Sequence, residues 1–308
     1  MRIVIFGAGG VGGYFGARLA AAGNEVTFVA RGAHLAAMRD RGLRILSPLG
    51  DIDVPKVVVA ETSASLRSVD FAFATVKLWD TQQAAHDLLP LAQKGATIVS
   101  FQNGVQKDEL LQELLPVGSV MGGVSYISAA IQEPGIIRHF GPIQRLLFGE
   151  YDGFRSPRAE ALHSACERAG ILASISEDIK REIWQKFVFL VGLSGVTAAM
   201  RQPIGAIREN RQTRAFLLGV MREVVSVGQA RGVALPQEYA EDRLAFCDTL
   251  PASMTASMYH DLQRGNRLEL PWLSGGVVEY GQQIGIPVPC NRAIADILAL
   301  YVNGAPVP

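Results

Sequence analysis

The chain has 308 residues, 49% of them hydrophobic, so it is long enough for two globular domains with separate cores and too apolar to be disordered. Its 29 basic and 29 acidic residues cancel, which excludes the basic surface expected of a nucleic-acid-binding protein and any basic tail for a membrane. The first apolar run follows only Arg2 and is soon interrupted by glycines, unlike a signal peptide or membrane span, so we expect a cytoplasmic enzyme with a small-molecule substrate.

The first half of the chain alternates short β-branched runs with helical stretches. Strands are predicted at residues 2–7, 25–31, 56–60, 69–77 and 96–104, with helices at 14–23 and 81–92. This alternation is typical of a Rossmann-type α/β domain, a doubly wound parallel sheet. Further β-rich segments at 122–131, 145–151 and 172–177, and a helix at 156–170, complete this half.

The first strand runs directly into "GAGGVGG", which has glycines in the G-x-G-x-x-G spacing and opens a helix. Glycines allow a tight turn and a close approach of the backbone to a pyrophosphate, which then faces the helix N-terminus. The motif sits in the strand–turn–helix context that it requires, so it favours a dinucleotide site over a purely structural glycine turn. The predicted phosphate loop comprises Gly7, Ala8, Gly9, Gly10, Val11 and Gly12.

The second predicted strand bears on the choice of coenzyme. An NAD site usually has a carboxylate about 20 residues after the glycines, to bind the ribose 2′-hydroxyl. Here Glu25 lies at the start of the strand and Arg31 at its end. Arg31 suits a 2′-phosphate, which favours NADP(H); the alternative is a solvated surface arginine.

Two more polar residues follow apolar strands. Lys77 ends "FAFATVK" and Asn103 ends "IVSFQNG". Ligands of open α/β sheets bind beyond the carboxyl ends of the strands, so Lys77, Asn103, Arg31 and the glycine loop are expected at one edge. Either residue alone would more often be an ordinary loop residue.

The second half of the chain has long helical periods and no strand-like alternation, which predicts an all-helical domain. The boundary is expected near Ser176, giving a dinucleotide-binding domain at 1–176 and a helical substrate and catalytic domain at 177–308. The predicted helices cover residues 179–200, 211–231, 236–246, 272–285 and 291–302.

Lys186 stands before the apolar run "FVFLVGLSGVTAAM". This run is too short to cross a bilayer comfortably, so we interpret it as a buried core helix. Reduction of a ketone requires a proton donor, and a lysine against an apolar wall can have its pKa lowered toward neutrality. The alternative is a lysine that snorkels at a helix end with its stem on Trp184.

A second cluster, Ser257 and Glu269, lies in "SMYHDLQRGNRLEL". On one continuous helix, twelve residues correspond to a rotation of roughly 120°, so the two side chains would flank one groove. This rotation does not apply if Gly265 breaks the helix.

The cysteines and histidines suggest no metal site. Cys166, Cys247 and Cys290 are far apart and without a C-x-x-C pair, so buried, reduced thiols are expected. The five histidines form neither a metal-like i,i+4 pair nor a recognisable triad with a serine.

Five motifs, "GAGGVGG", "VKLWDT", "FQNGV", "EIWQKF" and "SMYHDLQRGNRLEL", together resemble the ordered motif set of the ketopantoate reductase (2-dehydropantoate 2-reductase) family over essentially the whole chain. The resemblance implies a Rossmann domain joined to a helical domain. It also implies NADPH-dependent reduction of a branched 2-oxo acid to a 2-hydroxy acid, the pantoate-forming step of pantothenate biosynthesis.

The resemblance also assigns roles to single residues. The segment 7–12 resembles the phosphate loop and Arg31 the 2′-phosphate contact, while Lys77 and Asn103 match cofactor and substrate contacts. Lys186 matches the general acid and a substrate contact. Ser257 resembles the substrate-binding serine, and Glu269 matches the acidic residue near nicotinamide and substrate.

The predicted substrate pocket departs from the family. Leu190, Ser194 and Ile204 stand where asparagines are common, and Pro271 and Ser274 replace the usual acidic residue and asparagine. Leu190 lies one turn after Lys186, so a less polar pocket is expected, with Leu190 and Ser194 among the residues that line it.

Two other functions remain alternatives to this reductase. One is an NAD-linked 2-hydroxy acid dehydrogenase, against which Arg31 argues. The other is a non-catalytic module that senses NADPH, which would need neither Lys186 nor Glu269. A homodimer is one assembly that the sequence allows.

Overall fold

The computed structural model describes residues 1–63 and 66–304 and divides into two compact units. The first unit comprises Met1–Asn103 and Lys107–Glu182; the second comprises Gly104–Gln106 and Ile183–Pro308. The division therefore falls a few residues after the predicted boundary at Ser176. Residues 305–308 of the predicted second domain lie outside the described part of the chain.

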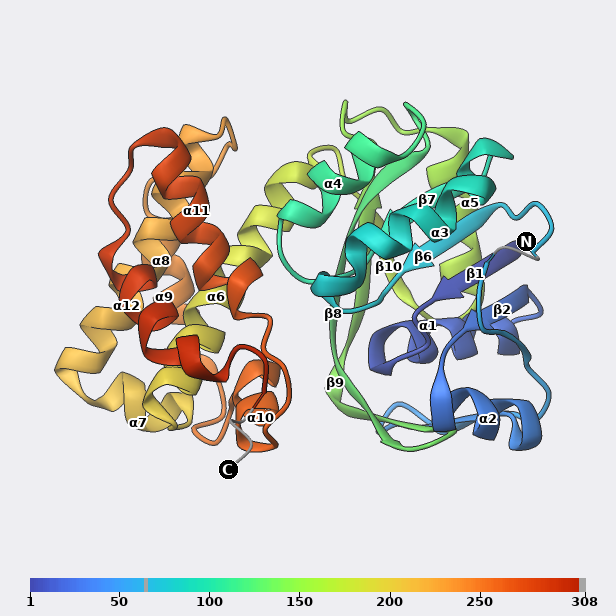
Figure 1. The fold of residues 1–308 in the computed structure, drawn as a ribbon, viewed down its shortest axis with the longest axis horizontal. Helices are drawn as coiled ribbons and strands as arrows, with labels where there is room; N and C mark the ends of the chain where they lie inside the picture. Colours follow the sequence, from blue (N-terminus) through green and yellow to red (C-terminus); the bar gives the residue numbers. More distant parts are fainter. Residues whose placement is uncertain (64–65, 305–308) are drawn as a thin grey trace. The chain divides into compact units, whose positions relative to one another are not determined.

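The first unit is built on a ten-stranded sheet with the order β4-β3-β9-β8-β7-β6-β1-β2-β5, and β10 pairs with β9 (Figure 1). The strands are β1 (Arg2–Phe6), β2 (Glu25–Val29), β3 (Leu43–Leu46), β4 (Ile52–Val54), β5 (Val58–Ala60), β6 (Phe71–Ala74), β7 (Thr97–Ser100), β8 (Val120–Glu133), β9 (Ile136–Gly149) and β10 (Leu172–Ile175).

Six of these strands form the predicted doubly wound arrangement. The path β5-β2-β1-β6-β7-β8 is parallel throughout, and its order corresponds to the 3-2-1-4-5-6 order of dinucleotide-binding domains. The chain changes direction across the sheet between β1 and β6, so the carboxyl ends of these strands flank the topological switch point, where such domains bind ligands.

Helices cover both faces of this sheet because alternate side chains of each strand point to opposite faces. Ile3 and Ile5 of β1 pack in the core that contains α1 (Gly10–Ala21), α2 (Gly32–Arg41) and α5 (Pro157–Arg168). Val4 and Phe6 pack in the core that contains α3 (Thr81–Gln93) and α4 (Gln106–Leu114). The run "RIVIF" is therefore apolar at every position but the first.

The rest of the sheet is mixed, not purely parallel. β8 and β9 are 14 residues each and pair antiparallel, as do β3 and β4. The sequence predicted β-rich segments for parts of β8 and β9 but none for β3 and β4. Strand direction was not predicted, because it depends on pairing partners and turns that short apolar runs do not encode.

Every regular element of the second unit, within the described residues, is a helix, as predicted. Its helices are α6 (Ile179–Met200), which begins in the first unit, then α7 (Ile204–Glu209), α8 (Arg211–Ala230), α9 (Tyr239–Thr249), α10 (Ser257–Gln263), η2 (Leu270–Trp272), α11 (Ser274–Ile284), α12 (Pro289–Leu298) and η3 (Ala299–Tyr301).

Helix α6 packs against α11 and α12 of this unit. Trp184 stacks on Tyr280 of α11, and the α6 residue Gly195 lies against Ile294 of α12, where an added Cβ would be 2.8 Å from the isoleucine Cδ1. At 22 residues the helix is long and apolar enough to span a membrane, contrary to the expectation from length, but 67% of its most apolar window is buried inside the protein. Burial, not length, identifies it as a core helix.

Candidate cofactor and catalytic sites

The turn after β1 has the geometry of a phosphate-binding loop. Gly7 has a φ of +103°, and a Cβ there would lie 2.7 Å from the backbone nitrogen of Val76. A Cβ on Gly12 would collide with the hydroxyl of Thr75 and with the carbonyl of Gly7. Both glycines are therefore required for α1 to pack closely on the strands.

Gly9 differs from these two glycines because a Cβ placed there would meet no atom within 4 Å. The first turn of α1 begins at the same point, and the amide of Gly13 donates back along the chain to the carbonyl of Gly9. The amides of Gly10, Val11 and Gly12 precede this first intrahelical bond. The open space at Gly9, at the start of this turn, fits the approach of a dinucleotide pyrophosphate, whereas a Cβ on Gly10 would collide with the carbonyl oxygen of Ala129.

Arg31 is the N-cap residue of α2, directly beyond β2, and its side chain is exposed. The carbonyl of Val29, two residues earlier, accepts the amides of Gly7 and Ala8 at 3.1 and 3.0 Å. The last residue of β2 is thus joined to the phosphate loop by backbone hydrogen bonds, two residues before Arg31, and the contact of Arg31 with a dinucleotide stays a prediction.

Buried polar side chains hold the loops of Lys77 and Asn103 together. Gln102 accepts a hydrogen bond from Ser100 Oγ (2.9 Å) and donates to Thr81 Oγ1 (2.8 Å), whose hydroxyl donates to the carbonyl of Leu78 (2.8 Å). These bonds connect the chain after β7 with η1 (Leu78–Asp80), which follows β6.

Lys77 and Asn103 therefore lie at the same edge of the sheet as the glycine loop. Lys77 is exposed, with its ammonium 5.6 Å from the ring centre of Trp79, and Asn103 is half-buried. Sequence reasoning missed Thr75, Thr81 and Gln102, because a polar residue after a strand has the same local pattern whether it is exposed or pairs inside the fold.

In the second unit, Lys186 lies near the start of the apolar part of α6 and is half-buried, as is Leu190 one turn later. Trp184 packs against Phe187 and Tyr280. Lys186 and Leu190 share one partly accessible face.

Three other residues of the predicted substrate pocket are less accessible than Leu190, whereas Pro271 is exposed. Ser194, Ile204 and Ser274 each have an exposed fraction of 0%. A Cβ on Gly195 would lie 3.2 Å from Ser274 Oγ, which places this hydroxyl inside the packing of α6 and α11. In this structure Ser194 therefore contributes to the core behind Leu190, and its role as a substrate contact stays a prediction.

Ser257 and Glu269 do not lie on one helix. Helix α10 ends at Gln263, and Gly265 has a φ of +66°, so the 120° estimate does not apply. Ser257 is exposed in the first turn of α10. Glu269 is 6% exposed and caps η2, where its carbonyl accepts the amides of Trp272 and Leu273.

The cysteines are free, and two of them, Cys166 and Cys247, are buried. Cys290 is only partly buried, contrary to expectation. Burial raises the pKa of Cys166 to about 12 and the pKa values of Cys247 and Cys290 to about 11. Within residues 1–63 and 66–304, no three His, Cys, Asp or Glu side chains are grouped as a metal site would require.

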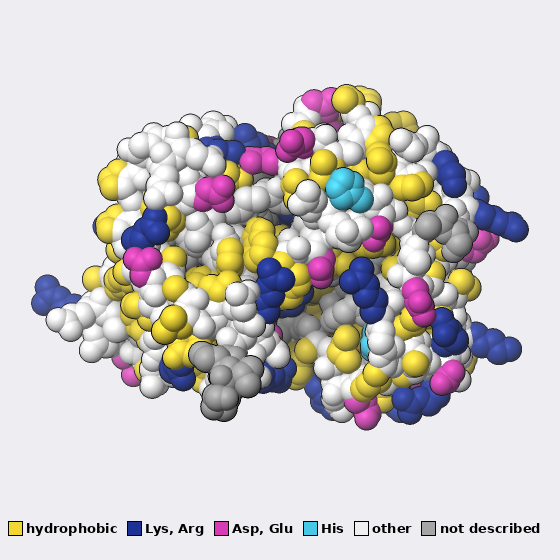
Figure 2. Space-filling view, in the orientation of Figure 1, with side chains coloured by type: hydrophobic (Ala, Val, Ile, Leu, Met, Phe, Trp, Pro, Cys, Tyr) yellow, Lys and Arg dark blue, Asp and Glu magenta, His cyan; other side chains and the backbone are white. Residues whose placement is uncertain are grey.

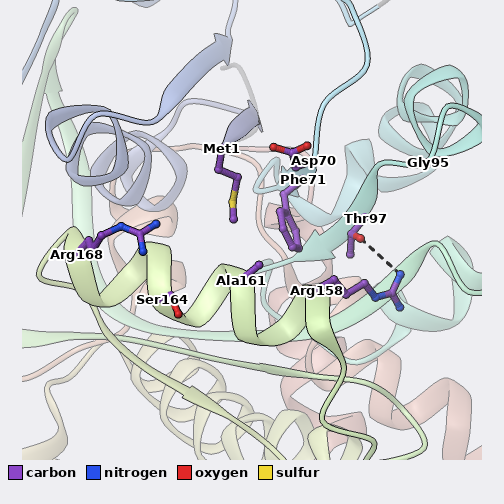
Figure 3. Close-up of a pocket in the computed structure, with 9 residues that line it drawn as sticks. All are labelled: Met1, Asp70, Phe71, Gly95, Thr97, Arg158, Ala161, Ser164 and Arg168. Atoms are coloured by element: carbon purple, nitrogen blue, oxygen red, sulfur yellow. Dashed lines mark hydrogen bonds between the residues drawn. The ribbon is translucent and has the colours of Figure 1, made fainter.

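A separate hollow of about 790 Å³ lies in the first unit, along α5 and the amino ends of β6 and β7 (Figure 3). Arg158 on its wall is already bonded to Glu150 and to the carbonyl of Gly118. This edge is opposite to the glycine loop, so the hollow is not part of the cofactor site.

On the face drawn in Figure 2, side chains of both charges are interspersed and do not gather in a patch of one sign. This distribution agrees with the balanced composition and offers, on that face, no basic surface of the kind that nucleic-acid binding requires.

Comparison with known proteins matches both halves of the chain to one family. Residues 3–153 match the family described as "Ketopantoate reductase PanE/ApbA", and residues 178–302 match "Ketopantoate reductase PanE/ApbA C terminal". A 2-dehydropantoate 2-reductase of Halobacterium salinarum is 31% identical over 301 residues, covering 97% of this chain and 98% of the relative. An "uncharacterized oxidoreductase" of Bacillus subtilis is 28% identical over 302 residues, covering 98% and 99%.

Solved structures show the same fold. A PanE/ApbA family ketopantoate reductase from Ralstonia eutropha has a TM-score of 0.89 at 31% identity, covering 98% of each chain. A D-mandelate dehydrogenase, solved with NADH and anilino(oxo)acetate, has a TM-score of 0.88 at 20% identity and the same coverage. At that identity the second likeness is one of fold alone.

Proposed function

Because this chain belongs to the ketopantoate reductase PanE/ApbA family, a family of oxidoreductases, we propose that it uses NADPH to reduce a 2-oxo acid to a 2-hydroxy acid. The observation that carries the proposal is that each unit holds residues for one of the two sites that the reaction requires. The first unit has a fitted phosphate loop with Arg31 beside it, and the second has Lys186 on a partly accessible helix face.

The residues of the first unit fit NADPH. The amides of Gly10, Val11 and Gly12 would hold the pyrophosphate, and Arg31 would form charge-assisted hydrogen bonds to the 2′-phosphate. Lys77 and Asn103 would contact the cofactor further along the same edge. Glu25, the acidic residue of β2, lies at the opposite end of that strand from Arg31, which argues against the NAD-linked alternative.

When bound, the nicotinamide supplies the hydride that reduces C2 of the substrate. Lys186 Nζ then donates a proton to the oxygen bound to C2, so that the ketone becomes a hydroxyl. Glu269, a buried carboxylate, contributes orientation and negative charge to the same reaction. A sensor of NADPH would have no use for this pair, which argues against a non-catalytic module.

The substrate class follows from Leu190. The reaction that the relatives' names give is reduction of 2-dehydropantoate, which remains the default for this chain. Leucine cannot pair a substrate hydroxyl, and an unpaired hydroxyl costs about 1–3 kcal/mol. The Leu190 side chain can, however, bury an additional methylene of the substrate, which contributes about 0.8 kcal/mol to binding. We therefore propose that a 2-oxo acid with an apolar side chain competes well with ketopantoate.

The test is to follow the absorbance of NADPH with a panel of 2-oxo acids, including ketopantoate and acids of similar size without its hydroxyl. The expected result is turnover with a comparable or higher kcat/KM for the apolar acids. A preference of about a hundredfold or more for ketopantoate would refute the apolar pocket and assign the chain to pantothenate biosynthesis. Inactivity across the panel would contradict the enzyme proposal itself.

A cytoplasmic location and a homodimeric assembly remain part of the proposal. The cytoplasmic location is supported by the three free thiols and by the burial of most of α6. Sedimentation of the purified protein measures its assembly directly.

A further inference from the structure

Lys107 is almost completely buried, although it takes no part in the proposed chemistry. Its exposed fraction is 2%, and that of its neighbour Asp108 is 6%. A buried ammonium is costly unless its protons are paired. The Lys107 ammonium contacts both carboxylate oxygens of Asp108, at 2.8 and 2.9 Å, so the two charges form a buried ion pair at the start of α4.

The same ammonium also closes a loop of the main chain. It donates to the carbonyl of Ser100, the last residue of β7, at 3.2 Å and to the carbonyl of Gly123 in β8 at 3.3 Å. The chain leaves the sheet after Ser100, passes through Asn103 and enters α4, in which Lys107 is the second residue. The side chain of Lys107 therefore joins the two ends of the segment that presents Asn103.

Asp108 is held in turn from the other side. Burial raises the pKa of this carboxyl, an effect that the Lys107 charge opposes, and the hydroxyl of Tyr151 forms a further hydrogen bond with it. The pair is thus fixed by groups from β7, β8 and the segment that follows β9, which makes it a rigid anchor for a short loop.

We propose that Lys107 and Asp108 are positioning residues for the cofactor, acting through Asn103. The inference rests on the proposed role of Asn103 in binding NADPH. It assigns to the buried ion pair a part in the placement of the Asn103 amide, because the pair fixes both ends of the segment that carries this residue.

A double-mutant cycle tests this inference, with the Kd for NADPH measured from the nicotinamide fluorescence. Lys107→Met/Asp108→Asn removes both charges together, so neither is left buried alone. We expect Asn103→Ala to raise Kd about fivefold and the pair variant to raise it about threefold. Combined with Asn103→Ala, the pair variant should cause no further change, because both act through one contact.

Two further variants separate positioning from general stability. Leu111→Ala removes a completely buried side chain from the same helix, and it should lower Tm while leaving Kd unchanged. Tyr151→Phe removes only the hydroxyl that contacts Asp108. As the milder change, it should raise Kd about twofold, in the same direction as the pair variant.

Additive effects in the cycle, or an unchanged Kd in the pair variant, would overturn the inference. It would also be overturned if Leu111→Ala raised Kd as much as the pair variant does, or if Asn103→Ala had no effect. Failure of the unaltered protein to bind NADPH would instead overturn the proposed function.

Discussion

Arg31 tests coenzyme selectivity at the level of a single side chain. Arg31→Ala should raise the Kd for NADPH about tenfold or more and leave that for NADH within about twofold, because only NADPH carries the 2′-phosphate. Fluorescence titration with both coenzymes measures the two values. Arg39→Ala, which removes another exposed arginine of α2, is the matched control. Equal affinities for the two coenzymes in the intact protein would contradict the assignment.

A substitution of Lys186 tests the proposed proton donation to the substrate oxygen. Lys186→Ala should lower kcat by about 10²-fold or more, because the developing alkoxide loses its proton donor. Binding of NADPH should stay close to that of the intact protein, since the cofactor residues belong to the first unit. Steady-state kinetics and titration separate these effects, with Lys180→Ala, an exposed lysine earlier on α6, as the control. Loss of folding with no separate kinetic effect would favour a structural lysine.

Lys186 and Lys107 also mark how far single residues could be predicted. Lys186 stands out in the sequence because an ammonium is unusual beside an apolar helical run. Lys107 does not, because "QKDEL" has the polarity of an exposed helix start, and the carbonyls that bury its ammonium come from β7 and β8. Gln102 was missed for the same reason. Burial by distant strands leaves no local pattern.

At the level of the elements, Glu150 joins the end of β9 to α5. Its carboxylate accepts from Ser156 Oγ and Arg158 Nε, each at 2.6 Å. Burial raises the pKa of Glu150, but the hydrogen bonds of Arg158 and Ser156 outweigh it and leave the pKa lowered. A lowered carboxyl pKa contributes stability that is fully present above the unfolded value near 4.5 and is lost as the pH falls through the folded pKa.

Glu150→Gln should therefore lower the free energy of unfolding at pH 7 by about 1–3 kcal/mol. The difference from the intact protein should shrink below pH 4.5, where the wild-type carboxylate itself becomes protonated. Urea denaturation over a series of pH values measures both effects. Glu160→Gln, in the exposed pair with Arg155, should change stability far less, because surface ion pairs are screened by solvent. A pH-independent difference would contradict the linkage.

Arg201, just after α6, is the residue other than glycine for which the described chain has a positive φ, +53°. Its guanidinium also lies over Tyr301, 5.4 Å from the ring centre. Arg201→Gly and Arg201→Ala both remove this contact, but only glycine adopts the left-handed conformation without strain. The glycine variant should be more stable than the alanine variant by about 1 kcal/mol in urea denaturation. Equal stabilities would show that the backbone relaxes.

The elements that could be predicted were those with a strong period of their own. Helix α6 was predicted with both ends correct, because charged residues precede a long apolar run. By contrast, α2 and α4 were not predicted. Each is short and buries only three residues, so their apolar patterns are too brief to distinguish from a loop. The helix predicted at residues 236–246 is α9, which begins at Tyr239, three residues later than predicted, because Pro236 and the next two residues form a turn.

For the whole molecule, binding of NADPH should appear as thermal stabilisation. A ligand at about 100 times its Kd adds about 2.7 kcal/mol to the stability of the state that binds it. The resulting shift in Tm should be the same in the intact protein and in Lys186→Ala. At the same NADPH concentration it should be about half as large or less in Arg31→Ala, because a tenfold higher Kd leaves a stabilisation of about 1.4 kcal/mol. A shift that disappears in Lys186→Ala would contradict the assignment of the cofactor residues to the first unit.

The path of the chain also limits how the molecule can be dissected. Gly104–Gln106 belongs to the second unit although its last residue begins α4 of the first unit. The Gln106 amide occupies the position that a Cβ on Gly276 would take. The later division falls inside a helix, where proteases find no extended segment to cut. A fragment starting at Ile183 would lack residues 104–106, which pack with the helical unit. The two units are therefore not interchangeable modules: exchanging one for its counterpart from a relative requires transplanting the 104–106 segment with the helical unit.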